Sequence, residues 1–369
     1  MENQIATEKA ENEVLREQYK KLTGRKILLF FSLIVAVIIL IGLSCNISGR
    51  EMTLTEGLSA IFRRLIGDCN YEWNSKLWWD DRIVWTYIMP RVAVALVAGA
   101  GLAAAGTVMQ SVLNNPLAEP YTTGVSSGAV FGACLMIIMG VSIATPGLQQ
   151  YGLVVNAFLF ALIPVGIIIL LSKLTNFLSP VTMILAGTAI SYFFGGLTTL
   201  MLVTADENDL ASAYKWQVGS LANISWGEIQ IIAVFVVLAV VVMMFLTKYL
   251  NALTLGDKAA KSLGVDVNKV RTISLLMVAL SAAAIVSFTG IIGFVGMLSP
   301  HIVRSVIGGD NRFVFPSAMA LGMVILLFAD TVTRYFALVD IPAGAVMMFI
   351  GAPVFLYLML RKNRGRSWA

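Results

Sequence analysis

One acidic and one basic residue lie four positions apart in an apolar segment near the C-terminal end of the sequence. Asp330 precedes Arg334 by about one helical turn, and acid before base is the favoured order for an ion pair on a helix. If the segment crosses a membrane, such a carboxylate can instead carry protons for an ion-coupled pump. A proton relay normally needs more than one such group, and we find no paired carboxylates in the apolar segments. A self-neutralising pair is therefore the favoured interpretation.

Other residues that perform catalysis or bind metals are sparse. The chain has one histidine, His301, and its three cysteines, Cys45, Cys69 and Cys134, show no CxxC spacing, so no metal site is predicted. Cys45 and Cys69 could pair if both faced an oxidising compartment, but free thiols are the default. Residues 256–262, Gly-Asp-Lys-Ala-Ala-Lys-Ser, lack the second glycine of a nucleotide-binding P-loop. We therefore predict no catalytic site and no cofactor bound by this chain.

Two polar segments interrupt the apolar sequence, and the first contains two prolines. It reads Asn-Asn-Pro-Leu-Ala-Glu-Pro over residues 114–120, and Gly-Val-Ser-Ser-Gly follows at 124–128. Proline ends the preceding helix, and small residues let backbone or a transported molecule approach closely. A tight turn between helices explains the prolines equally well, so both interpretations stay open.

The second polar segment, residues 251–267, predicts a short amphipathic helix between Gly256 and Gly264. One face of that helix carries Ala259, Ala260 and Leu263, and two lysines flank it. Such a helix can lie among lipid headgroups or fit a groove on a partner protein. The residue types alone do not choose between these two roles.

The composition indicates an integral membrane protein. Of the 369 residues, 58% are hydrophobic and only 13% are charged, whereas soluble domains have about 25% charged residues. A single soluble core cannot bury so much apolar surface. The composition therefore excludes a cytosolic enzyme and a disordered chain. The net charge of +5 comes from basic residues near the termini and in short loops, which favours contact with a lipid bilayer over nucleic acid.

Ten apolar runs predict an all-α protein with ten transmembrane helices. They cover residues 27–43, 91–112, 122–141, 152–172, 180–203, 229–248, 272–292, 295–307, 314–337 and 343–360. The run 295–307 is shorter than the roughly 20 residues that a crossing needs, so it should be tilted, broken or shielded by protein. Small residues are frequent in these runs, which indicates a closely packed bundle.

Polar segments flank the predicted transmembrane domain, residues 27–360. They are an N-terminal tail over 1–26, an outer loop over 46–82, an inner loop over 248–271 and a C-terminal tail over 361–369. Most of the 26 Lys and Arg residues lie in the two tails and the inner loop, which predicts that both termini are cytoplasmic. No apolar stretch opens the chain, so no cleaved signal peptide is expected.

Four tryptophans, Trp73, Trp78, Trp79 and Trp85, lie near the end of the outer loop. Tryptophan is enriched at the boundary between lipid and water, so the cluster fits an interfacial belt. It also fits the packing of a small surface helix, because tryptophan serves both purposes.

Taken in order, these segments resemble the FecCD-type permease subunits of ABC importers for iron–siderophore complexes, haem and vitamin B12. The matching motifs are Met89-Pro-Arg91, Gly106-Thr-Val-Met-Gln110, Asn115-Pro-Leu-Ala-Glu-Pro120, Gly124-Val-Ser-Ser-Gly128, Leu185-Ala-Gly187, Trp216-Gln-Val-Gly-Ser-Leu221, Leu255-Gly-Asp-Lys-Ala-Ala-Lys-Ser-Leu-Gly264, Gly293-Phe-Val-Gly296, Pro300-His301, Ala329-Asp330, Ile341-Pro342 and Gly351-Ala-Pro353. The resemblance implies the type II ABC importer permease fold, with ten spans, in the plasma membrane of a prokaryote. It further implies a dimer with a second copy or a paralogue, around a path on the two-fold axis.

The resemblance also implies two other partners. A cytoplasmic ABC ATPase dimer, which binds ATP and magnesium, would contact the coupling residues Leu255, Gly256, Asp257, Ala259, Ala260, Leu263 and Gly264. An extracytoplasmic substrate-binding protein would dock on arginines of the outer face, and Arg91 and Arg334 occupy the matching positions. A third family arginine is replaced by Ile88, with Arg82 as a possible substitute. The motif Pro300-His301 is then a structural feature of its helix.

We expect small polar residues near the translocation path or its inner gate, namely Asn115, Ser126, Ser127, Ser179, Pro180, Val181 and Thr182. Family members often carry small polar residues where Pro180 and Val181 stand. The predicted function is the permease subunit of an ABC importer for a metal chelate, with iron–siderophore first, then cobalamin and haem. The alternative from another class is a secondary transporter driven by an ion gradient, which would need no ATP and would depend on Asp330.

Overall fold

Each of the ten predicted apolar runs lies on a helix in the computed structural model, which describes residues 2–46, 52–67, 71–175, 179–222, 224–336 and 341–362. In chain order these helices are α1 (Glu2–Asn46), α4 (Met89–Val112), α5 (Val125–Met139), α6 (Gly152–Thr175), α7 (Pro180–Thr204), α9 (Trp226–Leu253), α11 (Val267–Thr289), α12 (Val295–Ile307), α13 (Asn311–Tyr335) and α14 (Ala343–Lys362). Seven spans of the described chain are long and apolar enough to cross a membrane, whereas α5, α12 and α14 are shorter apolar helices.

Shorter elements connect these helices. They are α2 (Leu54–Ile66), α3 (Lys76–Ile83), the π-helical turn η1 (Val84–Ile88), the 3-10 turns η2 (Pro120–Thr123) and η3 (Pro146–Tyr151), α8 (Glu207–Gln217) and α10 (Asp257–Ser262). Side chains that accept hydrogen bonds from the first turn begin several helices, as Ser225 does for α9 and Asp266 for α11. The outer loop therefore contains two helices, α2 and α3.

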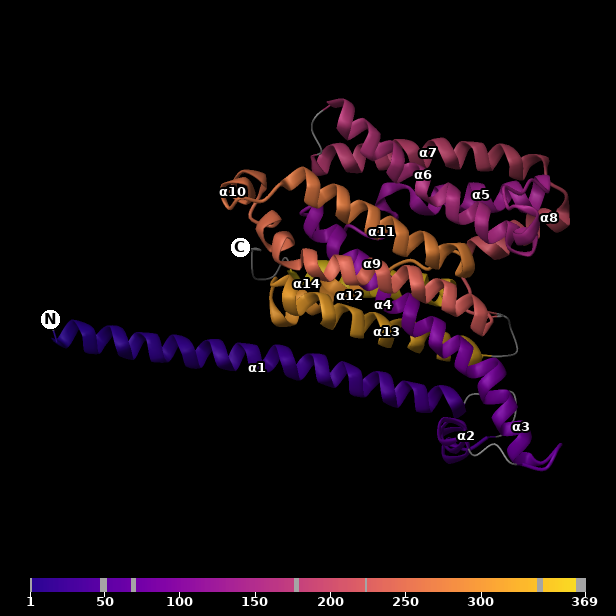
Figure 1. Ribbon diagram of the computed structural model, residues 1–369, viewed down its shortest axis with the longest axis horizontal. Coiled ribbons are helices and arrows are strands. Elements are labelled where there is room, and N and C mark those ends of the chain that lie inside the picture. Colours follow the sequence, from indigo (N-terminus) through magenta and orange to yellow (C-terminus); the bar gives the residue numbers. More distant parts are fainter. Residues whose placement is uncertain are drawn as a thin grey trace.

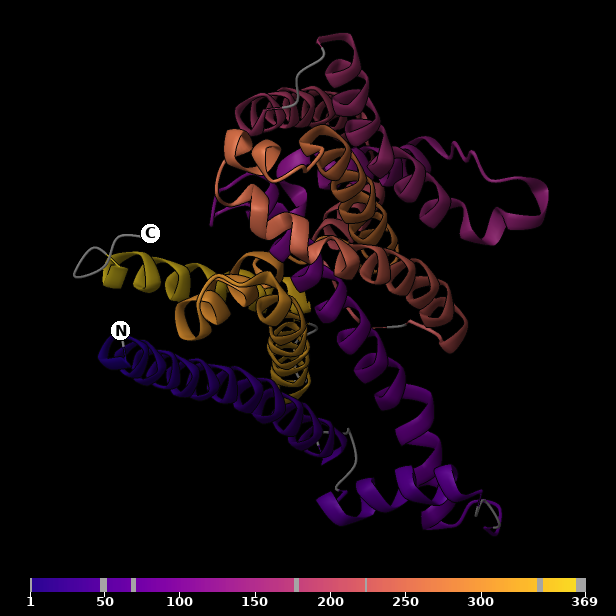
Figure 2. The ribbon, with the colours of Figure 1, turned by 60° about the vertical axis from the view of Figure 1, so that its left-hand side comes forward.

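The bundle has two distinct ends (Figures 1 and 2). The start of α1, the short helix α10 and the end of α14 lie at one end, which we call the α10 end. Helices α2, α3 and α8 lie at the opposite end, which we call the α2 end. The charged residues 2–26 continue α1 as one helix that extends past the bundle at the α10 end.

Helix α4 forms the centre of the bundle, in contact with α9, α11, α12 and α13. It can be enclosed this way because Gly and Ala fill its middle, and small residues let helices approach closely. Gly99 lies against Gly322 of α13, and a Cβ at Gly99 would be 2.5 Å from the Gly322 carbonyl oxygen. Gly106 is tighter still, because a Cβ there would be 1.7 Å from the Gly296 carbonyl oxygen of α12.

Substituting alanine for Gly106 is therefore expected to destabilise the protein by about 3 kcal/mol, because α12 would have to move away from α4. The matched control is Gly166→Ala on α6, where no atom lies within 4 Å of the added Cβ. Thermal unfolding of the purified protein in detergent measures both variants. Equal midpoints for the two variants would contradict the close approach of α4 and α12.

The non-helical backbone inside the bundle forms hydrogen bonds with other backbone groups. Gly219 N–H donates to the Ile291 carbonyl oxygen at 3.0 Å, Ser220 N–H donates to Thr289 at 2.7 Å, and Gly344 N–H donates to Gly219 at 2.7 Å. These bonds satisfy polar groups that would be costly to leave unpaired at membrane depth. They also anchor the start of α14 near the break between α11 and α12. The short helix α12 is buried along most of its length, so it is shielded by protein as expected.

Candidate transport and partner sites

Asn115 organises the turn that follows α4. Its Oδ1 accepts a hydrogen bond from the Leu117 N–H at 3.0 Å, and its own N–H donates to the Gln110 carbonyl at 3.0 Å. These hydrogen bonds replace the helical hydrogen bonding that ends at Pro116, because proline has no backbone N–H to donate. Asn115 is half-buried, so any contact with the translocation path comes in addition to its role in the turn.

After this turn the chain re-enters the bundle, where η2 contacts α4, α5, α6, α7 and α11. The Glu119 carboxylate accepts a hydrogen bond from the backbone N–H of Phe294, the residue before α12. Phe294 has a φ of 68°, in the left-handed region that favours glycine. The Tyr121 hydroxyl donates to the Ile292 carbonyl at 3.3 Å, 171 residues away in sequence. Sequence reasoning missed this junction, although an acid between two prolines in an uncharged stretch pointed to it.

Ser126 and Ser127 lie half-buried in the first turn of α5. Gly124, with φ of 87°, precedes that turn, and only a residue that tolerates this conformation can start α5 here. Gly128 then lets α5 approach α6, because a Cβ at Gly128 would be 2.3 Å from the Phe160 carbonyl oxygen. The small residues of 124–128 therefore serve helix packing as well as a turn.

The turn over Ser179–Thr182 begins α7. Ser179 Oγ accepts a hydrogen bond from the Thr182 N–H at 3.0 Å and lies 2.8 Å from Thr182 Oγ1, while Pro180 takes the first helical position. Val181 is largely exposed. In the described residues α7 meets η2 further along, where a Cβ at Gly187 would be 2.4 Å from the Thr122 carbonyl oxygen. Helix α7 therefore packs against η2 about two turns beyond its first residue.

The predicted helix of the inner loop is present as α10, at the end of the bundle that also holds the start of α1. Gly256 and Gly264 bound it with φ of 95° and 80°, as the sequence indicated. Asp257 binds Arg271 of α11 through two hydrogen bonds of 2.7 Å each. Arg271 is almost completely buried, and a two-pronged pair of this kind holds α10 in a defined orientation. Sequence reasoning did not identify Arg271 as the partner.

The predicted apolar face of α10 is divided in the structure, so that part of the expectation was wrong. Ala260 is fully buried against the bundle and Ala259 is half-buried. Leu263 is 65% exposed, and Leu255 just before α10 is 67% exposed. The reason is the length of α10: one and a half turns bring Ala260 inward and leave Leu263, its C-cap residue, pointing outward. The α10 end therefore exposes two leucines, Leu255 and Leu263, beside two exposed lysines.

Arg91 and Arg334 share one carboxylate at the α2 end. Arg91 Nη2 lies 2.8 Å from Asp330 Oδ1, and Arg334 Nε lies 3.1 Å from Asp330 Oδ2. Asp330 is completely buried, and the side chains of Arg91 and Arg334 are 22% and 10% exposed. Arg334 also donates to the Ser44 carbonyl at 2.9 Å. The predicted Asp330–Arg334 pair is therefore confirmed, and Arg91 is a second partner that the sequence alone did not indicate.

This cluster joins α1, α4 and α13 and carries one net positive charge. The Ser44 carbonyl lies in the last turn of α1, where the helix dipole is negative and stabilises a cation. Both carboxylate oxygens of Asp330 are already bound. The arrangement can hold three helices together, and it leaves mainly Arg91 accessible from outside.

A second polar network lies at the α10 end. Asn251, near the end of α9, donates to Asp310 Oδ1 at 2.7 Å and accepts from the Asn311 N–H at 2.8 Å. Asn311 Oδ1 in turn accepts from Arg304 Nη2 at 2.8 Å. Arg304 also donates to Ser111 Oγ of α4 at 2.9 Å. The network connects the segment before α10 with the end of α4, and no sequence pattern predicted it.

The remaining candidates are structural. His301 is buried on α12 and stacks edge-on against Phe355 at 6.3 Å between ring centres. Cys45 and Cys134 are buried and form no disulfide within the described residues, and the possible pair of Cys45 with Cys69 lies outside them. Among the described residues no group of three His, Cys, Asp or Glu side chains is placed to hold a metal ion.

Comparison with known proteins identifies the family. The model of the FecCD transport family matches residues 33–361. An ABC transporter permease protein of Methanocaldococcus jannaschii is 38% identical over 94% of this chain and 97% of its own. The iron(3+)-hydroxamate import permease FhuB of Bacillus subtilis is 34% identical over 89% of this chain and 85% of its own.

A solved structure agrees with these relatives. It is an inward-facing metal-chelate type ABC transporter, with a TM-score of 0.77 and 29% identity, covering 90% of this chain and 98% of that chain. Other relatives are named for hemin or vitamin B12 transport. The chain belongs to the FecCD transport family and is the multi-pass membrane permease subunit of an ABC importer for metal chelates.

Proposed function

We propose that the cargo is a ferric siderophore. The observation that carries this proposal is the 34% identity to the iron(3+)-hydroxamate permease over most of both chains. The hemin permease of Yersinia pestis is equally identical, and vitamin B12 permeases are close behind, so haem and cobalamin are the direct competitors. A metal chelate is large, so we expect a path lined by small side chains with few specific polar contacts.

All ten apolar helices are proposed to cross the plasma membrane of a prokaryote, with both termini cytoplasmic. The three helices that are short for a crossing, α5, α12 and α14, are supported by surrounding protein or by paired backbone. The α10 end carries the basic residues of the N-terminal helix and of the inner loop. That end would then be cytoplasmic, and the α2 end would face outward.

The coupling residues Leu255–Gly264 are proposed to bind the ABC ATPase dimer, whose own sites hold ATP and magnesium. Leu255 and Leu263 are exposed at the proposed cytoplasmic face, and Asp257–Arg271 holds α10 rigidly to α11. A rigid segment transmits force from a moving partner better than a loose loop. The two leucines would fill apolar hollows on the ATPase, and the flanking lysines would meet acidic residues at the rim.

The second permease, a copy of this chain or a paralogue, is proposed to pack beside α7. This helix exposes large apolar residues along its length, including Leu185, Phe193 and Val203. The path would run between the two permeases on their two-fold axis. Asn115, Ser126 and Ser127 are proposed to lie near the path, and the turn over Ser179–Thr182 to form part of the inner gate.

Arg91 and Arg334 are proposed to serve the substrate-binding protein unequally. Arg91 retains an exposed edge, whereas Arg334 is occupied by Asp330 and Ser44. Arg91 would meet an acidic residue of the binding protein directly, and Arg334 would hold Asp330 in place. An Arg91→Gln variant, which removes the charge but keeps a hydrogen-bond donor for Asp330, is then expected to lower uptake without releasing the ATPase.

Uptake of radiolabelled iron as ferric siderophore, in cells with and without this chain, tests the proposal. Unlabelled haem and cobalamin serve as competitors. Arsenate, which depletes ATP, should stop the chain-dependent uptake, whereas a protonophore applied while ATP is maintained should not. Uptake that survives ATP loss and stops with the protonophore would favour the secondary transporter. Absent iron uptake with chain-dependent uptake of haem or cobalamin would move the cargo to that competitor.

A further inference from the structure

Helix α2 has one apolar face that packs on the bundle and another that is bare. Gly57 and Ala60 are buried, and a Cβ at Gly57 would be 2.8 Å from Cys45 Cβ at the end of α1. On the opposite face Phe62, Leu65 and Ile66 are all largely exposed. Their spacing of three and four residues places them on one stripe of the helix. We call the described residues 52–67 and 71–88 the outer insertion.

The orientation of α2 differs from that of the bundle helices. Figure 1 views α2 almost end-on while the bundle helices run across the picture, and Figure 2 shows α2 from the side. The helix therefore runs across the bundle direction, at its α2 end. In a protein whose long helices cross the membrane, such a helix lies parallel to the membrane surface.

Helix α2 lies beside an exposed apolar part of α1. Helix α1 contacts α2 and exposes Ile38, Ile39 and Leu43 in its last turns. Only a small part of the apolar span of α1 is buried inside the protein, so its exposed residues are available to contact lipid. Because the two surfaces are neighbours, lipid that covers the end of α1 also reaches α2.

The neighbouring helix α3 and the segment before it carry tryptophans and an arginine. Trp73 is almost fully exposed, and the guanidinium of Arg82 lies over Trp78 at 5.1 Å from the ring centroid. Indole rings concentrate where headgroups meet acyl chains, and arginine is attracted to lipid phosphate there.

The Lys76 side chain and then Thr53 donate hydrogen bonds that lower the pKa of Glu56 to about 2. Glu56 is therefore ionised at neutral pH, and the stabilisation from its pairing is lost progressively as the pH falls from about 4.5 towards 2.

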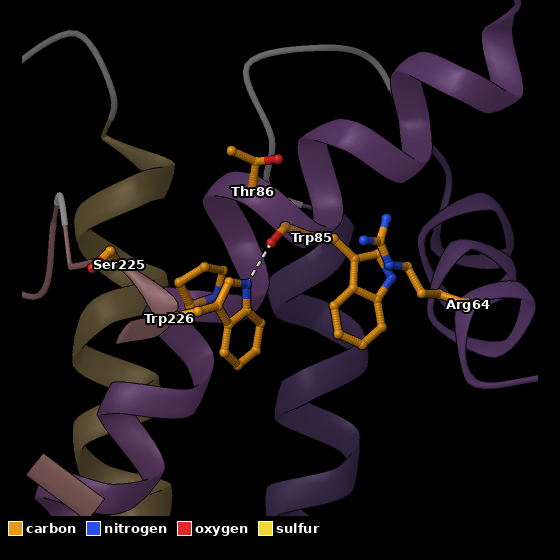
Figure 3. Close-up of a pocket in the computed structure, with 6 residues that line it drawn as sticks. Arg64, Trp85, Thr86, Ser225 and Trp226 are labelled. Atoms are coloured by element: carbon orange, nitrogen blue, oxygen red, sulfur yellow. Dashed lines mark hydrogen bonds between the residues drawn. The ribbon is translucent and has the colours of Figure 1, made fainter. Parts of the chain in front are cut away.

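A cavity of about 280 Å³ lies between the insertion and α9, lined by Arg64, Trp85, Thr86, Pro90, Ser225 and Trp226 (Figure 3). The rings of Trp85 and Trp226 stack at 6.0 Å, and Trp226 Nε1 donates to the Trp85 carbonyl at 2.9 Å. Arg64 lies over the Trp85 ring at 5.6 Å and donates Nη1 to Asp81 at 2.9 Å. Its side chain is 52% exposed, so other guanidinium N–H groups remain at the cavity wall.

We propose that the outer insertion is a lipid-binding surface, with α2 seated in the outer leaflet and Arg64 binding the phosphate of a phospholipid headgroup. The guanidinium matches phosphate geometry through paired N–H groups. The two indole rings form the wall on which the glycerol region of the lipid rests. The contact of α2 with α1, whose apolar span is mostly exposed, favours this occupant over a second copy of the chain or a binding protein.

Spin labels on α2 of the full chain in phosphatidylethanolamine–phosphatidylglycerol vesicles test the seating of the helix. Cysteines would replace Phe62, Leu65 or Ile66 singly, in a background with Cys45, Cys69 and Cys134 changed to alanine. We expect these labels to collide readily with oxygen and poorly with a water-soluble nickel chelate, and a label at the exposed Glu72 to do the reverse. Nickel accessibility equal to that at Glu72 would show that α2 faces water. Exclusion of both reagents would show that a protein covers it, and either result overturns the proposal.

Binding of phosphatidylglycerol to the detergent-solubilised chain, counted by native mass spectrometry, tests the cavity. Arg64→Gln should weaken binding of the tightest lipid roughly tenfold, as expected for loss of a charge-assisted hydrogen bond. Arg64→Lys, which keeps the positive charge near Asp81, should retain part of the lipid affinity. Arg312→Gln, at the opposite end of the bundle, should leave the lipid affinity unchanged. Inorganic phosphate should not displace the lipid. Unchanged binding by Arg64→Gln, or displacement by free phosphate, would overturn the assignment of Arg64 to a lipid.

Discussion

Replacement of Asp330 by alanine is expected to destabilise the folded protein by about 3–5 kcal/mol, the cost of leaving buried charge without its partner. Arg91 and Arg334 would then repel each other, with only the Ser44 carbonyl and hydroxyl left to accept from Arg334. Helices α1, α4 and α13 would separate at the α2 end. Thermal unfolding in detergent, followed by circular dichroism, measures the loss. Glu207→Ala, which removes an exposed acid from α8, is the control and should cost less than about 1 kcal/mol.

A triple variant separates charge pairing from packing at this cluster. Replacing Arg91 and Arg334 by methionine together with Asp330→Leu removes all three charges and keeps most of the volume. Buried ion pairs replaced in this way are often neutral in stability, so the triple variant should unfold near the wild-type temperature. A triple variant as unstable as Asp330→Ala would contradict the charge explanation.

A further variant, Asp330→Asn, distinguishes the cluster from a proton relay. If Asp330 only joins helices, then Asp330→Asn molecules that fold should still import cargo with ATP, in proportion to the amount of folded protein. If Asp330 carries protons, folded Asp330→Asn protein should be inactive. Transport assays normalised to the folded fraction therefore decide the matter.

Leu263→Asp is expected to release the ATPase partner. Burying an exposed leucine in an interface contributes about 1.5–3 kcal/mol, and an aspartate in its place would have to be desolvated. The affinity should therefore fall by at least about tenfold, since each 1.4 kcal/mol is one factor of ten. Co-purification of the ATPase in detergent, at several concentrations, measures the change. Adding Leu255→Asp should abolish recovery of the complex.

Leu263→Met is the matched control, because it preserves an apolar side chain of similar volume and should retain the ATPase. The unfolding temperature of the isolated permease should be unchanged in all these variants, since both leucines are exposed and make no core contact. Full recovery of the ATPase with Leu263→Asp and Leu255→Asp together would contradict the coupling role of this segment.

Much of the architecture could be predicted from local sequence. Every apolar run became a helix because a segment in lipid must pair its own backbone groups, so hydropathy and length nearly determine its conformation. The ends of α10 were predictable for a similar reason. Gly256 and Gly264 adopt positive φ angles that other residues rarely accept, and such positions are visible in the residue types themselves.

The partners of individual side chains were far less predictable. Asp330 and Arg334 were paired correctly from their spacing of four, but Arg91 lies 239 residues away from Asp330 in sequence. The same holds for Glu119 with Phe294 and for Arg304 with Ser111. No local sequence pattern predicts these contacts, because each depends on which helices pack together and on their relative positions along the bundle axis.

The division between the two levels follows from the range of the forces involved. The amino-acid sequence determined which segments form apolar helices, which end carries the basic charge and where the chain turns, since these depend on the residue types of each segment alone. Tertiary packing decided that Arg334 is buried, that Ala260 points inward while Leu263 stays bare, and that α2 lies across the bundle. These outcomes require neighbours from distant parts of the chain, because a small residue such as Gly106 has consequences only when another helix comes to occupy the space it leaves.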